Sequence, residues 1–204
     1  MAEKSDQLTP EEIEVLARVE SDHKVLEALI EELSGHSRRK RQLVAHVVKL
    51  LAEREPELLG PYVDDLVDAL DRPEAQTRWE VLDALSSLAE VDPDAVTGAF
   101  EGAEASLFDD GSATVRLAAF VFLCRLAASS PERSDEAWPL IDEAIQCYHG
   151  DAEYHDMLVA LVGLAQGKAS DATKKALAAR VKFDSENGAG YIRSFSLEIL
   201  SALK

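Results

Sequence analysis

The densest set of potential metal ligands lies in the stretch CYHGDAEYHD, residues 147–156. Its members are of the types that coordinate transition metals: Cys147, His149, Asp151, Glu153, His155 and Asp156. No pair among them has the CxxC or HExxH spacing of zinc sites. Gly150 can end one helix, and Asp151 can cap the next. We therefore interpret the stretch as a turn between helices, and we expect neither a metal nor another cofactor.

A second candidate is the run of cations at Arg38, Arg39, Lys40 and Arg41, within HSRRKRQLV (36–44). Clustered Arg and Lys side chains can contact the phosphates of nucleic acids. Cations at the start of a helix oppose the helix dipole, and this unfavourable placement favours a partner for the first three. The alternative is a solvated cluster balanced by three acids on the preceding segment: Glu27, Glu31 and Glu32.

The chain as a whole is strongly acidic. Its 204 residues include 39 Asp and Glu but only 21 Lys and Arg, which gives a formal net charge of −18. Affinity for nucleic acids comes mainly from cations that neutralise phosphates, so this balance argues against a nucleic-acid partner. An acidic surface limits nonspecific association, and a salt-rich cytoplasm would favour the same composition.

Cysteine use and hydropathy predict a cytoplasmic protein. The two cysteines, Cys124 and Cys147, lie in unrelated segments and form no disulfide framework. The first residues, MAEKSDQLTPEE, have no apolar core of a signal peptide. The most apolar run, LAAFVFLC at 117–124, is far shorter than the roughly 20 residues of a membrane-spanning helix.

Motifs of catalysis are missing from the sequence. It contains no Gly-rich phosphate loop, no GxSxG motif and no Cys–His arrangement at a recognisable spacing. We therefore expect a protein that is not an enzyme.

Apolar residues recur at intervals of three and four from about residue 11 to the end of the chain, a pattern typical of α-helices. Short Gly, Pro, Asp and Ser clusters divide the chain into about eleven helices and predict an all-α fold. The first helix is expected over residues 9–20. Thr9 can cap it, Pro10 suits its first position, and Glu11 and Glu12 complement the dipole.

Five of these segments repeat one another. They are RQLVAHVVKLLA (41–52), RWEVLDALSSLA (78–89), RLAAFVFLCRLA (116–127), HDMLVALVGLAQ (155–166) and RSFSLEILSALK (193–204). Their first residues lie 37, 38, 39 and 38 positions apart, and each begins with Arg or His. A partner helix precedes each segment, so the period predicts stacked helical hairpins. The expected repeats cover 22–55, 56–92, 93–130, 131–167 and 168–204.

The chain resembles the HEAT-repeat family. The resemblance rests on DDGSATVRLAAFVFLCRLA (109–127), LDRPEAQTRWEVLDALSSLAEVDP (70–93) and NGAGYIRSFSLEILSALK (187–204), in which a turn leads into Arg and then spaced apolar residues. It implies a right-handed α–α superhelix of the HEAT and armadillo type over residues 22–204. With the helix at 9–20 as an N-terminal cap, residues 1–204 form a single domain. Solenoids of this kind mostly serve as scaffolds and binding surfaces.

The resemblance also implies a structural role for the repeated arginine. In such repeats it pairs with acids in the turns along the stack, and Asp71, Asp109, Asp110 and Asp184 are available here. Arg41 is the member of the basic run that occupies this repeat position, so we interpret it as structural. Arg38, Arg39 and Lys40 lie outside the pattern and stay candidate partner contacts.

The resemblance further implies that the second helix of each hairpin lines a concave face. The first and fifth positions after the repeated Arg or His would point away from the core: Gln42, His46, Trp79, Asp83, Leu117, Val121, Asp156, Ala160, Ser194 and Glu198. Trp79, Leu117 and Val121 would then form an apolar strip flanked by Asp83 and Asp156. Such a strip suits a protein or peptide partner that is apolar with basic flanks. The alternative is that the central helix is simply more deeply buried.

Two other functions from enzyme classes stay open at this point. Some HEAT-like proteins are DNA glycosylases, but they use a basic concave face, whereas the expected groove is acidic to apolar. A metal-dependent hydroxylase would need a His–Glu pair, and the chain offers only His155–Asp156. Finally, apolar residues at the C-terminal end, Ile199, Leu200 and Leu203, predict end-to-end self-association through the last repeat.

Overall fold

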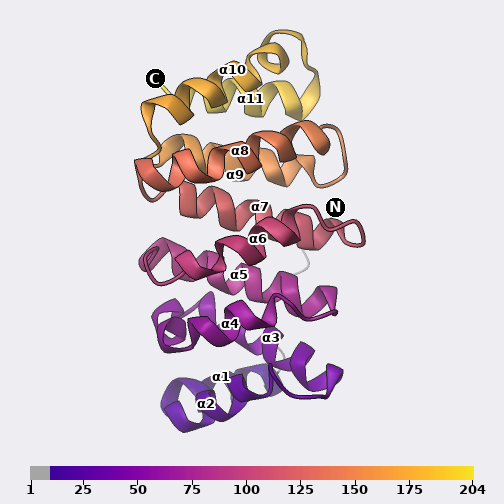
Figure 1. Ribbon diagram of the computed structural model, residues 1–204, viewed down its shortest axis with the longest axis vertical. Coiled ribbons are helices and arrows are strands. Elements are labelled where there is room, and N and C mark those ends of the chain that lie inside the picture. The colour runs from indigo at the N-terminus through magenta and orange to yellow at the C-terminus, as the bar shows by residue number, and fades with distance from the viewer. Residues whose placement is uncertain (1–9) are drawn as a thin grey trace.

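The computed structural model describes residues 10–204, which contain eleven α-helices, two short 3-10 helices and no strand (Figure 1). The elements are α1 (Pro10–Ser21), α2 (His23–Glu31), α3 (Arg38–Ala52), η1 (Pro56–Tyr62), α4 (Val63–Ala69), α5 (Ala75–Val91), η2 (Thr97–Ala99), α6 (Phe100–Leu107), α7 (Ala113–Ala127), α8 (Pro131–Cys147), α9 (Tyr154–Gln166), α10 (Asp171–Asn187) and α11 (Gly190–Ala202). The all-α prediction is confirmed. The expected cap Thr9 lies outside the described residues.

The helices form five hairpins that stack along the long axis of the molecule (Figure 1). Their second helices pack in series, with α3 against α5, α5 against α7, α7 against α9 and α9 against α11. The helix α1 packs on α2 and α3 at one end of the stack, and α10 packs on α11 at the other. The second helices therefore form a continuous layer, which we call the inner layer.

Serine side chains begin many of these helices. Ser37, Ser112, Ser130 and Ser170 each accept a hydrogen bond from the backbone N–H three residues later, at 3.0–3.4 Å. Each bond satisfies a donor that the first turn of a helix leaves unpaired. The first helix of the second hairpin starts instead as a 3-10 segment that contains Gly60 and Pro61. Proline has no N–H to donate to the helix, and an α-helix resumes only at Val63.

The pattern of burial corrects the expected register of the last two hairpins. The fourth residue after Arg78 is Leu82, and the fourth after Arg116 is Phe120; both are fully buried. In the alignment that starts from His155 and Arg193, the equivalent residues are Val159 and Leu197, but they are 49% and 50% exposed.

The equivalent buried residues of these hairpins are Leu158 and Ser196, one position earlier in the chain. Tyr154 and Ile192 therefore occupy the place of Arg116 in the repeat, which makes each of the last three intervals 38 residues. The expected alignment followed the cationic residues His155 and Arg193. Packing follows the apolar face of the helix instead, because burial of that face dominates helix stability in a protein.

A close backbone contact joins the end of α7 to the end of α9. The backbone N–H of Lys168 donates to the carbonyl of Ala128 at 2.7 Å. A Cβ atom on Gly167 would lie within 2.6–2.8 Å of Ala128, so only glycine permits this approach. The contact fixes the two inner helices that border the cleft described below.

Candidate functional site

Three arginines link consecutive hairpins, and we call Arg41, Arg78 and Arg116 the arginine ladder. Arg41 forms a two-point ion pair with Glu74 and donates to the carbonyl of Gly35 at 2.7 Å. This bond from Arg41 lowers the pKa of the Glu74 carboxyl. Both side chains are buried, which supports the structural interpretation of Arg41.

The next two arginines also link hairpins, Arg78 through one hydrogen bond and Arg116 through a two-point pair like that of Arg41. Arg78 Nη1 donates to Asp109 at 2.7 Å. Arg116 donates to Glu153 from Nε at 3.2 Å and from Nη2 at 2.6 Å, and also to the carbonyl of Asp109 at 2.9 Å. Each arginine thus binds an acid supplied by the following hairpin.

Only Asp109 among the four expected acceptors takes part in these pairs. Glu74 and Glu153 fill the other two positions, and Asp184 lies 3.0 Å from His149 instead. The expected list contained aspartates alone, whereas glutamates are the acceptors at two of the three steps. Arg193 is exposed and pairs with no described residue.

Arg41 differs from the rest of the basic run, as expected, but the other three cations are not alike. Lys40 pairs with Glu32 at 2.7 Å, whereas Arg38 and Arg39 are exposed and form no ion pair within residues 10–204. These cations lie at the first turn of α3, at the opposite end of that helix from the cavities described below.

The potential ligands of residues 147–156 point to separate partners. Glu153 binds Arg116, His149 lies beside Asp184, and His155 lies 2.7 Å from Asp156. His155 also contacts the rings of Tyr191 and Phe195 edge-on. In the described part of the chain, no group of three or more His, Cys, Asp or Glu side chains is arranged to hold a metal ion.

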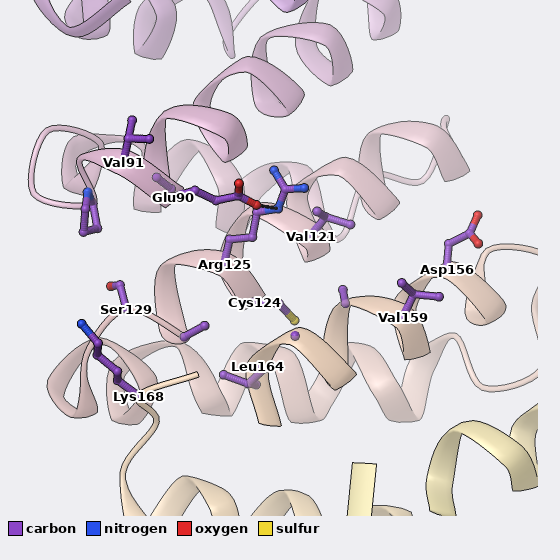
Figure 2. A pocket seen from close by; sticks show the side chains of 15 residues that line it. Glu90, Val91, Val121, Cys124, Arg125, Ser129, Asp156, Val159, Leu164 and Lys168 are labelled. Atoms are coloured by element: carbon purple, nitrogen blue, oxygen red, sulfur yellow. Dashed lines mark ion pairs between the residues drawn. The ribbon is translucent and has the colours of Figure 1, made fainter. Parts of the chain in front are cut away.

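A cleft of about 860 Å³ lies on the inner layer between α5, α7 and α9 (Figure 2). Its floor is apolar and is made by Val121, Cys124, Val159, Ala160 and Leu164. Its rim is charged, and it carries Glu90, Arg125, Asp156 and Lys168, with Arg125 Nε 3.1 Å from Glu90. The expected groove was acidic to apolar, but two cations also line the observed one. Burial raises the pKa of Cys124, so its thiol stays neutral.

A smaller cavity of about 270 Å³ adjoins the cleft, and Val121 and Arg125 line both. We call this cavity the polar niche. Its other lining residues come from α3 and α5 and the turn after α3: Lys49, Glu53, Asp83, Ser86 and Ser87. The two cavities together cross four successive hairpins on the inner layer.

Of the residues predicted to bind a partner, Asp83 lines the niche and Val121 lines both cavities. Trp79 and Leu117 are half-buried and line neither of these two cavities. The Lys49 ammonium lies 5.4 Å from the centre of the Trp79 ring, which therefore carries a cation–π contact within the protein.

Several lining residues were missed because the sequence analysis considered only the first and fifth positions after each repeated Arg or His. The same helical face continues at the ninth and twelfth positions after Arg116, which are Arg125 in α7 and Ala128 directly after it. Val159 was missed for another reason, since the expected register placed it in the core. With the observed register, the fifth position reads His46, Asp83, Val121, Val159 and Leu197, so the inner layer changes from polar to apolar along the stack.

Asp83 is the most strongly perturbed acid of the niche. Burial raises its pKa to about 6, although Lys49 at 3.9 Å opposes the shift. Its neighbour Glu80 is buried as well, and burial raises the pKa of Glu80 even though His46 Nδ1 lies 2.9 Å away.

We expect Asp83→Asn to stabilise the protein near pH 8 by about 1 kcal/mol, a value that allows for solvent screening at this partly exposed site. Between an ordinary Asp pKa near 4 and the folded value of about 6, the native state binds more protons than the unfolded state. The wild type therefore loses stability as the pH rises through this range. Urea unfolding of both proteins at pH 4, 6 and 8 measures the difference. An advantage of the variant that is equally large at pH 4 would contradict the assignment.

The C-terminal end of the stack differs from the expectation in detail. Ile199 is fully buried, and Leu200 and Leu203 are partly buried. The exposed apolar residues there are Phe183, Tyr191 and Leu197. Self-association through the last repeat stays a prediction.

The stacked hairpins, the arginine ladder and the groove on the inner layer define the class of the molecule, a HEAT/armadillo-like α-solenoid. Solved structures agree with this class. A designed armadillo repeat protein in complex with the peptide (KR)4 has a TM-score of 0.76 and 15% identity, over 93% of this chain and 85% of that one. Armadillo repeat proteins designed computationally for modular peptide recognition have a TM-score of 0.68 and 16% sequence identity, over 89% of this chain and 85% of that one.

A natural protein also has this fold. The archaeal HEAT-like repeats protein from Thermococcus onnurineus NA1 gives a TM-score of 0.56 and 12% identity, over 96% of this chain and 95% of that one. No protein family and no curated protein sequence matches the chain. At these identities the similarity establishes the fold alone. No helix within residues 10–204 is long and apolar enough to cross a membrane.

Proposed function

We propose that this protein is a non-catalytic interaction module of the cytoplasm that binds a peptide or a partner helix along its inner layer. The bound segment is apolar where it lies over Val121 and Val159, and it carries basic residues that face Asp83 and Asp156. Trp79 and Leu117 extend the same helical face toward the start of each inner helix and add apolar contact area.

The observation that carries this proposal is the cleft of about 860 Å³ with an apolar floor and a charged rim. Binding sites commonly combine an apolar surface with a few polar groups that fix the orientation of the ligand. Val91 and Val159 line the cleft and are each about half-exposed, so a ligand would remove their apolar surface from water. Two designed relatives in fold support this use, because one is in complex with the peptide (KR)4 and the other was designed for modular peptide recognition.

Selection from a displayed random-peptide library on the full chain tests the proposal. Fluorescence polarisation then measures the affinity of each selected peptide for the wild type and for two cleft variants, Val159→Arg and Gly163→Arg. Both positions are exposed, and a Cβ at Gly163 meets no atom within 4 Å, so the new side chains fill the cleft without disturbing the core. We expect each variant to weaken binding at least about tenfold, as loss of a central interface contact does.

Phe183→Arg is the matched control, because it makes a similar apolar-to-cation change at a 70% exposed position on α10. Peptides that bind through the cleft keep their affinity for this variant. The proposal fails if selection yields no binding peptide, or if the selected peptides bind both cleft variants as well as the wild type.

A further inference from the structure

The polar niche contains groups that the protein itself leaves incompletely paired. The Ser86 hydroxyl is buried and has no hydrogen-bond partner among the described residues, although Ser86 lines the niche. A buried polar group without a partner is unfavourable, so such a group commonly marks a site that a ligand or water completes.

The Asp83 carboxylate is the second incompletely paired group. Its nearest cation is Lys49 Nζ at 3.9 Å, beyond hydrogen-bond distance. Lys49 is itself shared, since it lies 3.4 Å from Glu53 and over the ring of Trp79. Arg125 also attracts the Asp83 carboxylate, but its guanidinium is shared, since Arg125 Nε lies 3.1 Å from Glu90.

The charges around Asp83 favour a further cation. The acids that act on Asp83 are Glu53 on the turn after α3 and Glu80 on α5. The cations are Lys49 on α3 and Arg125 on α7. His46 adds a positive charge beside Glu80 only when it is protonated. With His46 neutral, three carboxylates including Asp83 face two cations, and one of these cations, Arg125, also pairs with Glu90.

We propose that the polar niche binds one cationic end group, a guanidinium or an ammonium, carried by the segment that occupies the cleft. This inference rests on the proposed function, because the cleft must hold the rest of that segment. A cavity of about 270 Å³ has room for a side-chain end group and not for a folded element. Asp83 and the Ser86 hydroxyl are the acceptors, and a guanidinium can donate to both at once.

Val121 and Arg125 line both the cleft and the niche, so their position also sets the direction in which the bound segment runs. The cationic residue lies toward α3 and α5, and the apolar residues lie toward α7 and α9. Only ionised Asp83 attracts a cation, so binding is linked to the loss of a proton from this carboxyl. With a pKa of about 6, roughly a tenth of Asp83 is ionised at pH 5 and nearly all at pH 7.5, which predicts an affinity about tenfold weaker at the lower pH.

N-acetyl-arginine amide is the probe, and its uncharged citrulline analogue is the control ligand. Titration into the full chain is followed by NMR of the backbone amides and of the Asp83 carboxyl carbon. We expect saturable shifts at Asp83 and Ser86, affinity at least about tenfold weaker for the citrulline analogue or for Asp83→Asn, and a lower pKa of Asp83 in the bound form. Asp68→Asn, an exposed acid on α4, is the matched control for general attraction to an acidic surface.

Equal affinity for the citrulline analogue would overturn the inference, as would unchanged affinity in Asp83→Asn or an effect of equal size in Asp68→Asn. The peptide selection separates the two proposals. If selected peptides depend on Val159 but not on Asp83, the niche proposal fails and the proposed function stands. If the arginine amide binds at Asp83 while no peptide binds the cleft, the proposed function fails, and the niche is then a site for a free cationic group rather than for the end of a bound segment.

Discussion

Replacing Leu158 with alanine is expected to lower the free energy of unfolding by about 2–5 kcal/mol. Leu158 is fully buried between stacked hairpins, and its truncation removes apolar contacts and leaves a cavity that the neighbouring helices fill only in part. Its neighbour Val159 is 49% exposed on the cleft, so Val159→Ala is expected to change the same free energy by less than about 1 kcal/mol.

This adjacent pair tests the register of the fourth hairpin directly. Urea unfolding, monitored by circular dichroism, gives the midpoint concentration of urea for both variants. It also gives the slope of the free energy of unfolding against urea concentration, and this slope reveals any loss of cooperativity between hairpins. Phe120→Ala, at the equivalent buried position of α7, is the positive control with an expected loss of about 3–5 kcal/mol. If Val159→Ala costs as much as Leu158→Ala, the alignment based on His155 is right and the observed register is wrong.

Replacing Arg116 with alanine is expected to cost about 2–4 kcal/mol of stability. Arg116 joins the third hairpin to the fourth through Glu153, holds the carbonyl of Asp109, and lies over the ring of Tyr148 with 4.9 Å between the guanidinium and the ring centre. The Glu153 side chain is only 6% exposed, so the variant leaves a buried carboxylate without its cation. The expected cost lies below that of a fully enclosed pair because Arg116 retains some contact with water.

Two further variants separate the ladder from ordinary surface charge. Arg116→Lys keeps the charge but cannot bind Glu153 and the Asp109 carbonyl at the same time, so it should recover only part of the loss. Lys40→Ala breaks the exposed pair with Glu32 and should cost less than about 1 kcal/mol. Thermal and urea unfolding measure all three proteins. A loss in Arg116→Ala no larger than that in Lys40→Ala would show that the ladder contributes nothing beyond a surface ion pair.

The repeated positions explain which parts of the fold could be predicted from the sequence. Apolar residues at intervals of three and four, Gly, Pro, Asp and Ser clusters between them, and a period of 37–39 residues can be read along the chain, and they predicted the helices and their stacking. The role of Arg41 followed from its recurrence at Arg78 and Arg116, which separated it from Arg38 and Arg39. The glutamate acceptors could not be predicted, because which turn acid reaches each arginine depends on the distance between hairpins.

The candidate site shows the same division. The sequence by itself determined the stacked helical hairpins, the arginine ladder and the presence of Asp83 and Val121 on the inner layer. Tertiary structure alone decided the register of α9 and α11, and with it the exposure of Val159 and the polar-to-apolar change along the stack. The physical reason is that a helix can turn about its axis by one residue with little change in its local pattern. Only packing against the neighbouring hairpins decides which of two adjacent apolar side chains, Leu158 or Val159, is buried.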